Sequence, residues 1–259
     1  MAADNRVGTL LRDWRQRRRL SQLDLALEAG VSTRHLSFVE TGRSRPSVEM
    51  VLHLADQLEV PLRERNQLLL AAGYAPRYEA RSLEEDPGLA SVRDALHRVL
   101  TGHEPYPAFA IDGGWNLVMS NTALDPLLEG VAPELLIPPV NVMRLALHPQ
   151  GLAPRILNLG EWRGHLLDRL SRQLSATGDP RLEVLLDELR EYPGPRLQDA
   201  SDGHAIMVEL QLSASPQGGE LRFFSTVTTF GTAADVTVSE LSVEAFFPAD
   251  AQTAERLRG

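Results

Sequence analysis

The chain has 259 residues, of which 43% are hydrophobic and 24% charged, so it can hold one domain of ordinary size and a smaller one. The absence of cysteine excludes disulfide bonds, thiolate metal sites and cysteine nucleophiles. No apolar run approaches the roughly 18 residues that span a bilayer. The N-terminal residues also lack an apolar signal region, so we expect a cytoplasmic protein with no membrane partner.

The net charge of −9 is unevenly divided along the chain. Residues 1–73 hold 11 arginines and 9 acidic residues, whereas the remainder holds 15 arginines and 26 acidic residues; there is no lysine. Affinity for phosphate depends on local charge rather than on the total. This division predicts that any contact with DNA is confined to the first domain.

The first helix is expected over residues 7–18, because Leu10, Leu11 and Trp14 recur at helical spacing. Its end carries the run Arg17-Arg18-Arg19. Such a run either lies along DNA phosphates or forms a solvated face.

Two short helices joined by a tight turn are predicted next. Ser21 can cap the first of them, with Asp24 three residues later completing a capping box. Gly30 stands where the helix must stop with a positive φ, and Ser32 can cap the second helix, residues 33–41. This is the pattern of a helix-turn-helix whose second helix enters the major groove.

The outward side of that second helix is short, polar and cationic, which suits contact with base edges, and arginine can pair with guanine. Two arginines in the loop that follows can hold phosphates. The predicted DNA-binding residues are Gln22, Ser32, Thr33, Arg34, Ser37, Thr41, Arg43 and Arg45. Leu23 and Leu27, on the preceding helix, either contact another domain or subunit or fill the core.

Two further helices complete a compact domain over residues 1–73. The fourth helix begins after Pro46 and Ser47 and carries an apolar stripe, and the fifth extends from Leu62 to Ala72, with Gly73 ending it. Residues 74–104 are predicted to be a linker followed by a connector helix over 89–101, which serves either in signalling or in a dimer contact.

The run from Leu10 to about Gly73 resembles the Xre family of helix-turn-helix regulators. The resemblance rests on A-x-x-A-G-V-S at 26–32 followed by L-S-x-x-E-x-G-x-x-x-P-S at 36–47. It implies a DNA-binding domain with double-stranded DNA as the partner. The alternative is an alanine-rich helical pair that only packs.

From residue 105 the pattern changes to a mixture of strands and helices. Two short strands, 108–111 and 115–120, flank Asp112-Gly113-Gly114, which is a hairpin signal. A short helix is expected after Asn121, and the middle of the segment, 141–192, is expected to be helical.

Two more strands are expected to close the domain. Ile206, Val208, Leu210 and Leu212 alternate with polar neighbours, and a second alternating run from Leu221 to Val227 opposes them. The predicted fold class is therefore α+β: an N-terminal all-α five-helix helix-turn-helix domain and, over residues 105–259, a PAS-like antiparallel sheet with helices folded over one face.

Residues 105–250 resemble the ligand-binding domain of MmyB-like transcription regulators. The resemblance rests on LHPQGLAPRILNLGEW (147–162) and on LRFFSTVTTFGTAADVTVSELSVEAFFPAD (221–250), and Trp162 fits the tryptophan that follows the H-P-x-G block of that family. It implies a PAS-like domain able to hold a fatty-acid-like ligand.

The expected inner face of the sheet and its helical roof are apolar. An empty cavity there would cost roughly 24 cal/mol per Å³, so these residues either form a packed core or enclose an apolar, chain-like ligand. The predicted ligand-binding residues are Phe109, Ile111, Leu117, Met119, Trp162, Leu166, Leu170, Val208, Leu210 and Phe223. Arg144, Arg155 or Arg222 is a candidate partner for a carboxylate head.

No catalytic constellation is present in the sequence. Glu161 and His165 lie four residues apart, but two ligands without a third fall short of a zinc signature. Neither a phosphate loop nor a G-x-S-x-G elbow occurs. We therefore predict no metal, no cofactor other than a bound fatty acid or similar apolar ligand, and no enzyme activity.

The predicted function is a transcription regulator that binds an inverted-repeat operator and is modulated by a small apolar effector. A homodimer is expected because one recognition helix covers only a half-site. An alternative keeps the DNA-binding domain but makes the second domain a ligand-free dimerisation or protein-interaction module. A third hypothesis, an enzyme with an appended DNA-binding domain, lacks any catalytic motif.

Overall fold

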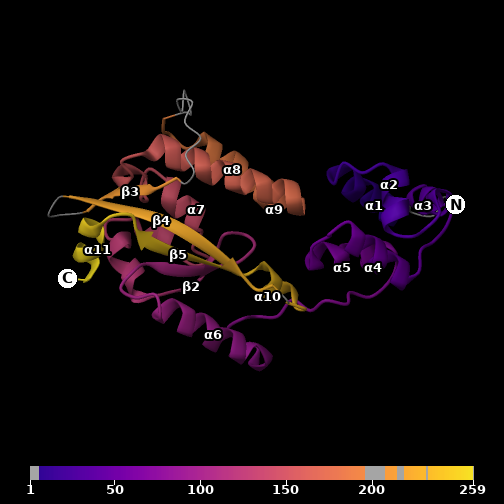
Figure 1. Ribbon diagram of the computed structural model, residues 1–259, viewed down its shortest axis with the longest axis horizontal. Helices are drawn as coiled ribbons and strands as arrows, with labels where there is room; N and C mark the ends of the chain where they lie inside the picture. The colour runs from indigo at the N-terminus through magenta and orange to yellow at the C-terminus, as the bar shows by residue number, and fades with distance from the viewer. Residues whose placement is uncertain (1–5, 196–207, 215–218, 232, 259) are drawn as a thin grey trace. The chain divides into compact units, whose positions relative to one another are not determined.

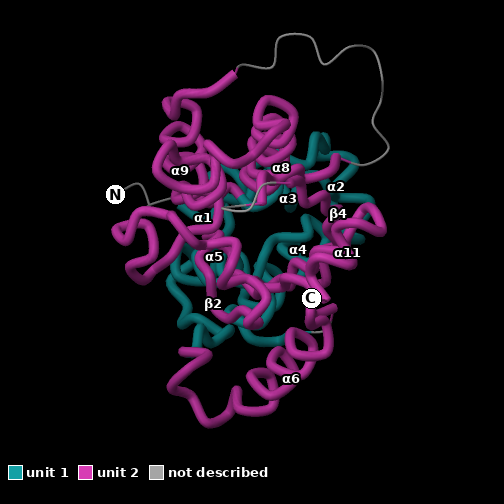
Figure 2. The backbone as a smooth tube through the Cα atoms, turned by 90° about the vertical axis from the view of Figure 1, so that its left-hand side faces the viewer, with its two compact units in different colours: residues 1–81, 175–177, 232–239 teal, residues 82–174, 178–231, 240–259 magenta. Residues whose placement is uncertain are grey.

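The computed structural model describes residues 6–195, 208–214, 219–231 and 233–258. The chain divides into two compact units, which Figure 2 colours separately. The N-terminal unit comprises residues 1–81, 175–177 and 232–239, and the C-terminal unit comprises residues 82–174, 178–231 and 240–259. In the described part of the chain, no helix has the length and hydropathy needed to cross a membrane.

Five helices form the body of the N-terminal unit, as the sequence predicted (Figure 1). They are α1 (Arg6–Arg17), α2 (Gln22–Glu28), α3 (Thr33–Glu40), α4 (Val48–Gln57) and α5 (Leu62–Ala71). Each helix contributes apolar side chains to one shared core, including the fully buried Leu11, Leu25, Leu36, Leu54 and Leu68. The burial of this apolar surface is what stabilises helices too short to persist alone.

The predicted caps set the boundaries of these helices. Ser21 Oγ accepts a hydrogen bond from the Asp24 amide at 3.1 Å, and the Asp24 carboxylate accepts one from the Ser21 amide at 2.9 Å. Ser32 Oγ accepts from the His35 amide, also at 3.1 Å. Gly30 has a φ of +63°. The turn between α2 and α3 is therefore fixed by local chemistry, and it orients α3 on the core.

Two leucines of α2 do not fill the core. Leu23 is 56% exposed and Leu27 is 71% exposed in the structure. Of the two explanations that the sequence allowed for them, core filling is wrong. The apolar side of α2 is narrow because only Leu25 and Ala26 of this helix are buried.

The segment after α5 is anchored rather than free within the N-terminal unit. Asn66 donates through Nδ2 to the Tyr78 carbonyl at 2.6 Å and accepts from the amides of Arg77 and Tyr78, both at 3.0 Å. The Val236 amide donates to the Glu79 carbonyl at 2.9 Å. The expected linker therefore follows a defined path over these residues.

The C-terminal unit contains one five-stranded antiparallel sheet with the strand order β2-β1-β5-β4-β3. The strands are β1 (Ala108–Ile111), β2 (Leu117–Ser120), β3 (Leu210–Ser213), β4 (Glu220–Thr229) and β5 (Ser242–Pro248). The α+β class and the two predicted pairs of strands are confirmed; Ile206 lies outside the described residues.

The central strand, β5, was missed by the sequence analysis. It pairs with β1 on one side and β4 on the other, and so joins the two hairpins into one sheet. Its sequence, SVEAFFP, places a glutamate at a buried position, and burial along the strand does not follow strict alternation. Strand prediction depends on the alternation of apolar and polar residues. The central strand of the sheet lacks this alternation.

Helices lie on both faces of this sheet, which corrects the expectation that they cover one face. Figure 1 shows α8 (Leu159–Thr177) and α9 (Pro180–Glu191) on one side and α6 (Ala90–Thr101) on the other, where α6 contacts β1 and β2. The remaining elements are η1 (Pro87–Leu89), η2 (Thr122–Leu128), η3 (Pro133–Leu136), α7 (Val142–Leu147), η4 (Ala153–Arg155), α10 (Val236–Glu240) and α11 (Ala251–Arg258).

Candidate nucleic-acid interface and ligand cavity

The outward side of α3 carries the predicted base-contacting residues. Thr33 and Arg34 are exposed and Ser37 is half-buried, whereas Leu36 and Val39 on the opposite side are fully buried. Ser32 and Thr41, at the two ends of the helix, are exposed as well. The helix therefore offers a polar, cationic side while its apolar side is held rigidly in the core.

Phe38 holds two arginines at this surface. The guanidinium of Arg34 lies 5.3 Å from the centre of the Phe38 ring and that of Arg43 lies 5.9 Å from it. The amide of Arg43 also donates to the Phe38 carbonyl at 2.8 Å, which fixes the loop after α3. Stacking of arginine on an aromatic ring limits its conformations without neutralising its charge. Arg34 and Arg43 are thus brought together beside the end of α3.

Behind α3 lies a buried ionic cluster that the sequence analysis did not identify. Glu40 is fully buried and accepts two hydrogen bonds from Arg15, Nε at 2.7 Å and Nη2 at 3.0 Å. Gln22 Nε2 donates to the same carboxylate at 2.8 Å, and Arg12 Nε lies 3.6 Å from it. Because these partners belong to α1 and α2, Glu40 joins the three helices that position the turn.

The cluster also controls the charge of Glu40. Burial raises the pKa of this carboxyl, but the hydrogen bonds from Arg15 and Gln22 and the charges of Arg15 and Arg12 outweigh burial, so the pKa lies below its usual value. The carboxylate therefore stays ionised at neutral pH. The spacing of Arg15 and Glu40 across two helices gives no local signal of their pairing, because only the tertiary fold brings them together.

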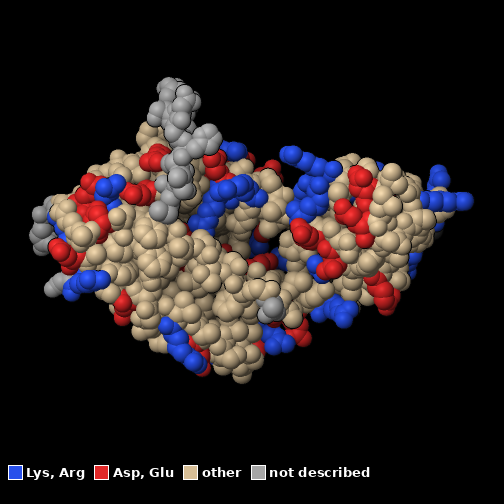
Figure 3. Space-filling model, viewed as in Figure 1, with Lys and Arg blue, Asp and Glu red and all other residues tan. Residues whose placement is uncertain are grey.

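Several polar side chains of the N-terminal unit make hydrogen bonds within that unit instead of pointing freely into solvent. Arg15 is buried against Glu40, and Gln22 is turned toward the same group. Arg18 donates to the carbonyls of Leu58 and Glu59, both at 2.8 Å, so part of the Arg17-Arg18-Arg19 run caps the end of α4. On the face that Figure 3 draws, basic and acidic atoms are interspersed over the N-terminal unit.

Arg45 caps a helix as well. Its Nε and Nη2 donate to the Ala72 carbonyl at 3.2 and 2.8 Å, and its guanidinium lies 5.2 Å from the Tyr74 ring. The side chain stays exposed, so the predicted phosphate contact remains a prediction. Arg43, by contrast, makes no hydrogen bond through its side chain to the described residues.

A cavity of about 80 Å³ lies in the C-terminal unit between the sheet and its helical cover. Five of the predicted ligand residues line it: Phe109, Leu117, Trp162, Leu166 and Leu210. Ile111, Leu170 and Phe223 are buried in the same core without lining the cavity, and Val208 packs against that core.

Met119 points away from this face of the sheet. Ile111 pairs with Leu117, whereas Ala110 pairs with Met119, so Val118 is an extra residue on β2 and forms a bulge. A bulge shifts the alternation by one residue. The alternating pattern of the sequence predicts Leu117 and Met119 on one face of the sheet, and this prediction is wrong because the register changes between them.

Much of the cavity wall comes from segments that alternation could not identify. η2 contributes Leu124, Leu127 and Leu128, while α7 and the chain after it contribute another group. That group consists of Val142, Met143, Leu145, Ala146, Leu152 and Ile156. Trp115, Leu212 and Phe246 complete the apolar wall. Short 3₁₀ segments have no extended period, so only their apolar composition signals burial.

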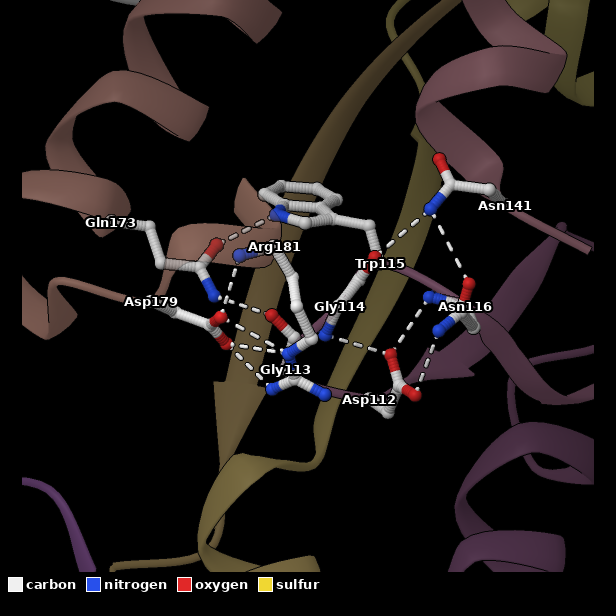
Figure 4. A network of polar contacts seen from close by, with 9 residues as sticks. All are labelled: Asp112, Gly113, Gly114, Trp115, Asn116, Asn141, Gln173, Asp179 and Arg181. Atoms are coloured by element: carbon white, nitrogen blue, oxygen red, sulfur yellow. Dashed lines mark hydrogen bonds and ion pairs between the residues drawn. The ribbon is translucent and has the colours of Figure 1, made fainter. Parts of the chain in front are cut away.

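Trp115 is held by a polar network around the β1–β2 hairpin, shown in Figure 4. Its indole nitrogen donates to Gln173 Oε1 at 2.6 Å, and Gln173 Nε2 donates to the Gly113 carbonyl at 2.9 Å. Asp112 accepts from the amides of Gly114 and Asn116, both at 2.8 Å. The network ties the hairpin to α8 and fixes one wall of the cavity.

The backbone of Trp115 is strained. Its φ is +66°, a region that bulky side chains rarely adopt. The two glycines that precede it, Gly113 and Gly114, do not have a positive φ. Strain of this kind persists only where surrounding contacts enforce it and is frequent at functional sites. Here the contacts are those of Gln173 and of the Arg169 guanidinium, 4.6 Å from the centre of the Trp115 ring.

Within the part of the chain that the structure describes, Glu244 is the one ionisable side chain that lines the cavity. It is 4% exposed, and its carboxylate accepts from Arg169 Nη1 and from Ser225 Oγ, each at 2.9 Å. Burial, followed by the charge of Arg169, lowers the pKa of the neighbouring His165. The cavity therefore has an apolar wall that includes one carboxylate, Glu244, whose charge is balanced by Arg169.

The three candidate head-group arginines differ in their partners. Arg144 makes two hydrogen bonds to Glu188, at 2.8 and 2.7 Å, and Arg222 donates to Glu209 at 2.6 Å. Arg155 donates only to backbone carbonyls. None of the three lines the cavity itself.

A second tight cluster joins α7 and α9. The Tyr192 hydroxyl donates to Glu188, and burial, followed by this hydrogen bond, raises the pKa of Tyr192 to about 12. Arg144 pairs with the same carboxylate and lowers its pKa. The cluster of Arg144, Glu188 and Tyr192 covers the outer side of α7. The opposite side of α7 faces the cavity.

The Glu161–His165 pair has other roles. Asn158 Nδ2 donates to Glu161 at 3.1 Å, and the His165 ring stacks on Trp162 with 5.4 Å between centres. Within the described ranges, no group of three or more His, Asp or Glu side chains is placed to hold a metal ion.

Comparison with known proteins agrees with this division of the chain. Residues 92–259 match the family described as "MmyB-like transcription regulator ligand binding domain", and residues 11–65 match the family described as "Helix-turn-helix". No curated protein matches the chain. A solved structure described as "Structure of an RNA-binding Light-Oxygen-Voltage Receptor" is similar at 13% identity with a TM-score of 0.26, too low to support an argument. The match covers 98% of this chain and 63% of that one, so the chain spans less than two thirds of the other's length.

Proposed function

The chain belongs to the family of MmyB-like transcription regulators, and from this premise we propose that it binds its operator through α3 and responds to an apolar, fatty-acid-like ligand in the C-terminal unit. It is a DNA-binding transcription regulator with a helix-turn-helix domain and a ligand-binding domain. These are the domains of a regulator and not of an enzyme. The proposed boundaries are 1–73 for the DNA-binding domain, 74–104 for the connecting segment and 105–259 for the ligand-binding domain.

The side of α3 that carries Thr33, Arg34 and Ser37 supports the DNA-binding part of this proposal. It is polar and cationic, and it lies opposite a rigid apolar core. Arg34 suits a bidentate contact with guanine, whereas Arg43 in the following loop suits a phosphate. Ser32, Thr41, Gln22 and Arg45 are proposed to support these contacts from the ends of the helices.

The cavity is the observation that supports a ligand. Its wall is almost entirely apolar, and it lies where the family's ligand-binding domain matches. Its volume of about 80 Å³ is several-fold smaller than the roughly 300–1,000 Å³ typical of ligand sites. A chain-like ligand must therefore enlarge it, and binding must be linked to a conformational change. This linkage is how an effector can alter DNA affinity.

The small volume also favours the alternative that the C-terminal unit is a ligand-free dimerisation or protein-interaction module. Solvent extraction and native mass spectrometry of the purified full chain distinguish the two. Co-purified fatty acid, or a thermal shift on adding long-chain acids, supports the ligand. A protein that contains no apolar compound and shows no shift with any such acid contradicts the proposal.

We expect Ala146→Leu to weaken binding of a long-chain acid by about tenfold or more, a loss of about 1.4 kcal/mol. Ala146 lines the cavity, and the three added carbon atoms occupy the space into which the ligand would expand. Filling an existing void should leave the unfolding temperature unchanged or higher. Thermal shift and titration of the acid measure both effects. Ala251→Leu, on the exposed first turn of α11, is the matched control. Equal affinities for both variants would place the ligand elsewhere.

We also propose that the protein binds DNA as a homodimer, since one recognition helix spans a half-site and two half-sites lie about one helical turn apart, roughly 34 Å. Analytical ultracentrifugation is expected to show two chains on one operator. A single chain, both free and on an operator selected by the protein from random DNA, would exclude the dimer.

A further inference from the structure

A second hollow adjoins the ligand cavity on the surface of the C-terminal unit. It is a groove of about 380 Å³, and Leu127 of η2 lines both the groove and the cavity. Polar and charged side chains surround this groove, in contrast to the cavity. They are Glu104, Thr122, Arg155 and Arg256.

The groove contains two guanidinium groups that have no carboxylate partner among the described residues. Arg155 Nη1 donates to the carbonyls of Leu127 and Glu129, at 2.9 and 3.1 Å, and its other nitrogens lie 3.5 Å from the Ser213 carbonyl. Arg256 is exposed and donates only to the Glu220 carbonyl, at 3.4 Å. A hydrogen bond to a neutral carbonyl group does not neutralise the positive charge of a guanidinium.

Glu104 is the acidic residue of the groove, and it is already engaged. Its Oε1 accepts from the Thr122 hydroxyl at 2.9 Å and from the Thr122 amide at 3.3 Å. Among the described residues, the ionisable side chains that line the groove are thus two arginines and one glutamate, a balance of one positive charge.

The cavity has the opposite preference. Among the described residues, its one ionisable wall residue is Glu244, whose negative charge is balanced by Arg169. An anionic head placed among the apolar side chains would lose its hydration without gaining a free cationic partner, which is costly. An amphipathic anion therefore has one favourable orientation, with its tail in the cavity and its head in the groove.

We propose that the groove binds the anionic head of an amphipathic ligand, a carboxylate or a phosphate, through Arg155 and Arg256, while its apolar tail passes Leu127 into the cavity. This assignment rests on the proposed function, in which the cavity holds an apolar ligand. It also gives a route by which the cavity opens. Arg155 holds the carbonyls of Leu127 and Glu129, and η2 forms part of the cavity wall. An anion that attracts the Arg155 guanidinium competes with those carbonyls and releases this wall.

Quenching of tryptophan emission in the full chain tests the orientation. Trp115 and Trp162 line the cavity, whereas Trp14 lies in the N-terminal core and provides a constant background. The probes are undecanoic acid brominated at its far end, the same acid brominated beside the carboxyl group, and the far-end-brominated alcohol and alkyl phosphate. Bromine quenches only at short range, so the far-end bromine should quench more strongly than the bromine beside the head.

The head-group preference is tested with the same probes. The acid or the phosphate should bind about tenfold more tightly than the alcohol, as expected for charge-assisted hydrogen bonds, and the tighter of the two identifies the head. Arg155→Gln and Arg256→Gln should each remove most of this advantage and change the affinity for the alcohol little. Arg256 makes one long hydrogen bond, so its variant separates loss of charge from loss of fold. Arg190→Gln, which alters an exposed side chain in the last turn of α9, is the control.

Three results would overturn the assignment while leaving a ligand cavity intact. They are equal affinities for acid, phosphate and alcohol, unchanged affinities in both groove variants, and stronger quenching by the bromine beside the head. Failure of every probe to bind would instead refute the proposed ligand function and this assignment together.

Discussion

Glu40→Ala is expected to reduce the stability of the N-terminal unit by about 3–5 kcal/mol, the usual cost of removing one partner from a buried ion pair. The substitution leaves the buried Arg15 guanidinium without its carboxylate and leaves Gln22 without its acceptor. Domains have free energies of unfolding of only about 5–15 kcal/mol, so the substitution would remove a large part of the stability of this unit. Hydrogen exchange of the α1–α5 amides in the full chain measures the loss.

Two further variants separate the ion pair from general effects of substitution. Glu28→Ala removes an exposed carboxylate from α2 and should change protection by less than about 0.5 kcal/mol. The double variant Arg15→Met with Glu40→Leu removes both charges and should recover much of the loss, because an apolar pair needs no desolvation of charge. If Glu40→Ala matched Glu28→Ala, the buried cluster would have no structural importance.

The same cluster predicts a dependence on pH. The folded-state pKa of Glu40 lies below that of an unfolded glutamate, about 4.3. Its ionisation therefore contributes stability that is fully present above pH about 4.3 and is lost as the pH falls through the folded-state value. Amide protection of α1–α3, corrected for the intrinsic rate at each pH, should fall over this range. The variant Glu40→Gln should remove this component of the pH dependence.

Arg34→Ala is expected to weaken operator binding by about 1–3 kcal/mol and to relax the preference for one base pair. Arg34 is exposed on the outward side of α3 and is oriented by Phe38. Arg43→Ala should instead weaken binding on every sequence and lower the slope of log affinity against log salt by about one. Competition binding on the selected operator and on random DNA, at several salt concentrations, distinguishes these effects.

The control for both arginines is Arg190→Ala in the C-terminal unit, which should leave DNA affinity unchanged. Equal losses on operator and random DNA for Arg34→Ala and Arg43→Ala would show that the base contact is misassigned. No loss for either would remove α3 from the interface.

In the N-terminal unit, the features that depend on residues near in sequence could be predicted, whereas those that depend on packing could not. Ser21, Asp24, Gly30 and Ser32 define the turn by local chemistry, because each cap hydrogen bond spans three residues, and the structure confirms each cap and the positive φ of Gly30. The pairing of Arg15 with Glu40 spans 25 residues and depends on how three helices pack. No periodicity records such a contact, so arginines with structural roles look in the sequence like arginines that bind phosphate.

In the C-terminal unit, the alternation of apolar and polar residues does not predict every strand and every face correctly. The alternation identified both hairpins, but one extra residue in β2 moved Met119 to the opposite face. β5 was missed because a buried charge, Glu244, interrupts its apolar pattern. That same glutamate lines the cavity. Departures from sequence rules are expected at functional sites, and the buried Glu244 agrees with the proposed ligand site in this respect.

The most direct test of DNA binding through α3 uses the absence of cysteine from the chain. Thr33→Cys places a unique thiol on the outward side of α3, and Ala251→Cys places one on α11 as the control. The rate of alkylation is measured with and without a saturating amount of the selected operator. If α3 lies in the DNA groove, operator DNA will slow alkylation at position 33 strongly and leave the rate at position 251 unchanged. Equal rates at position 33 in the free and fully bound protein would contradict it.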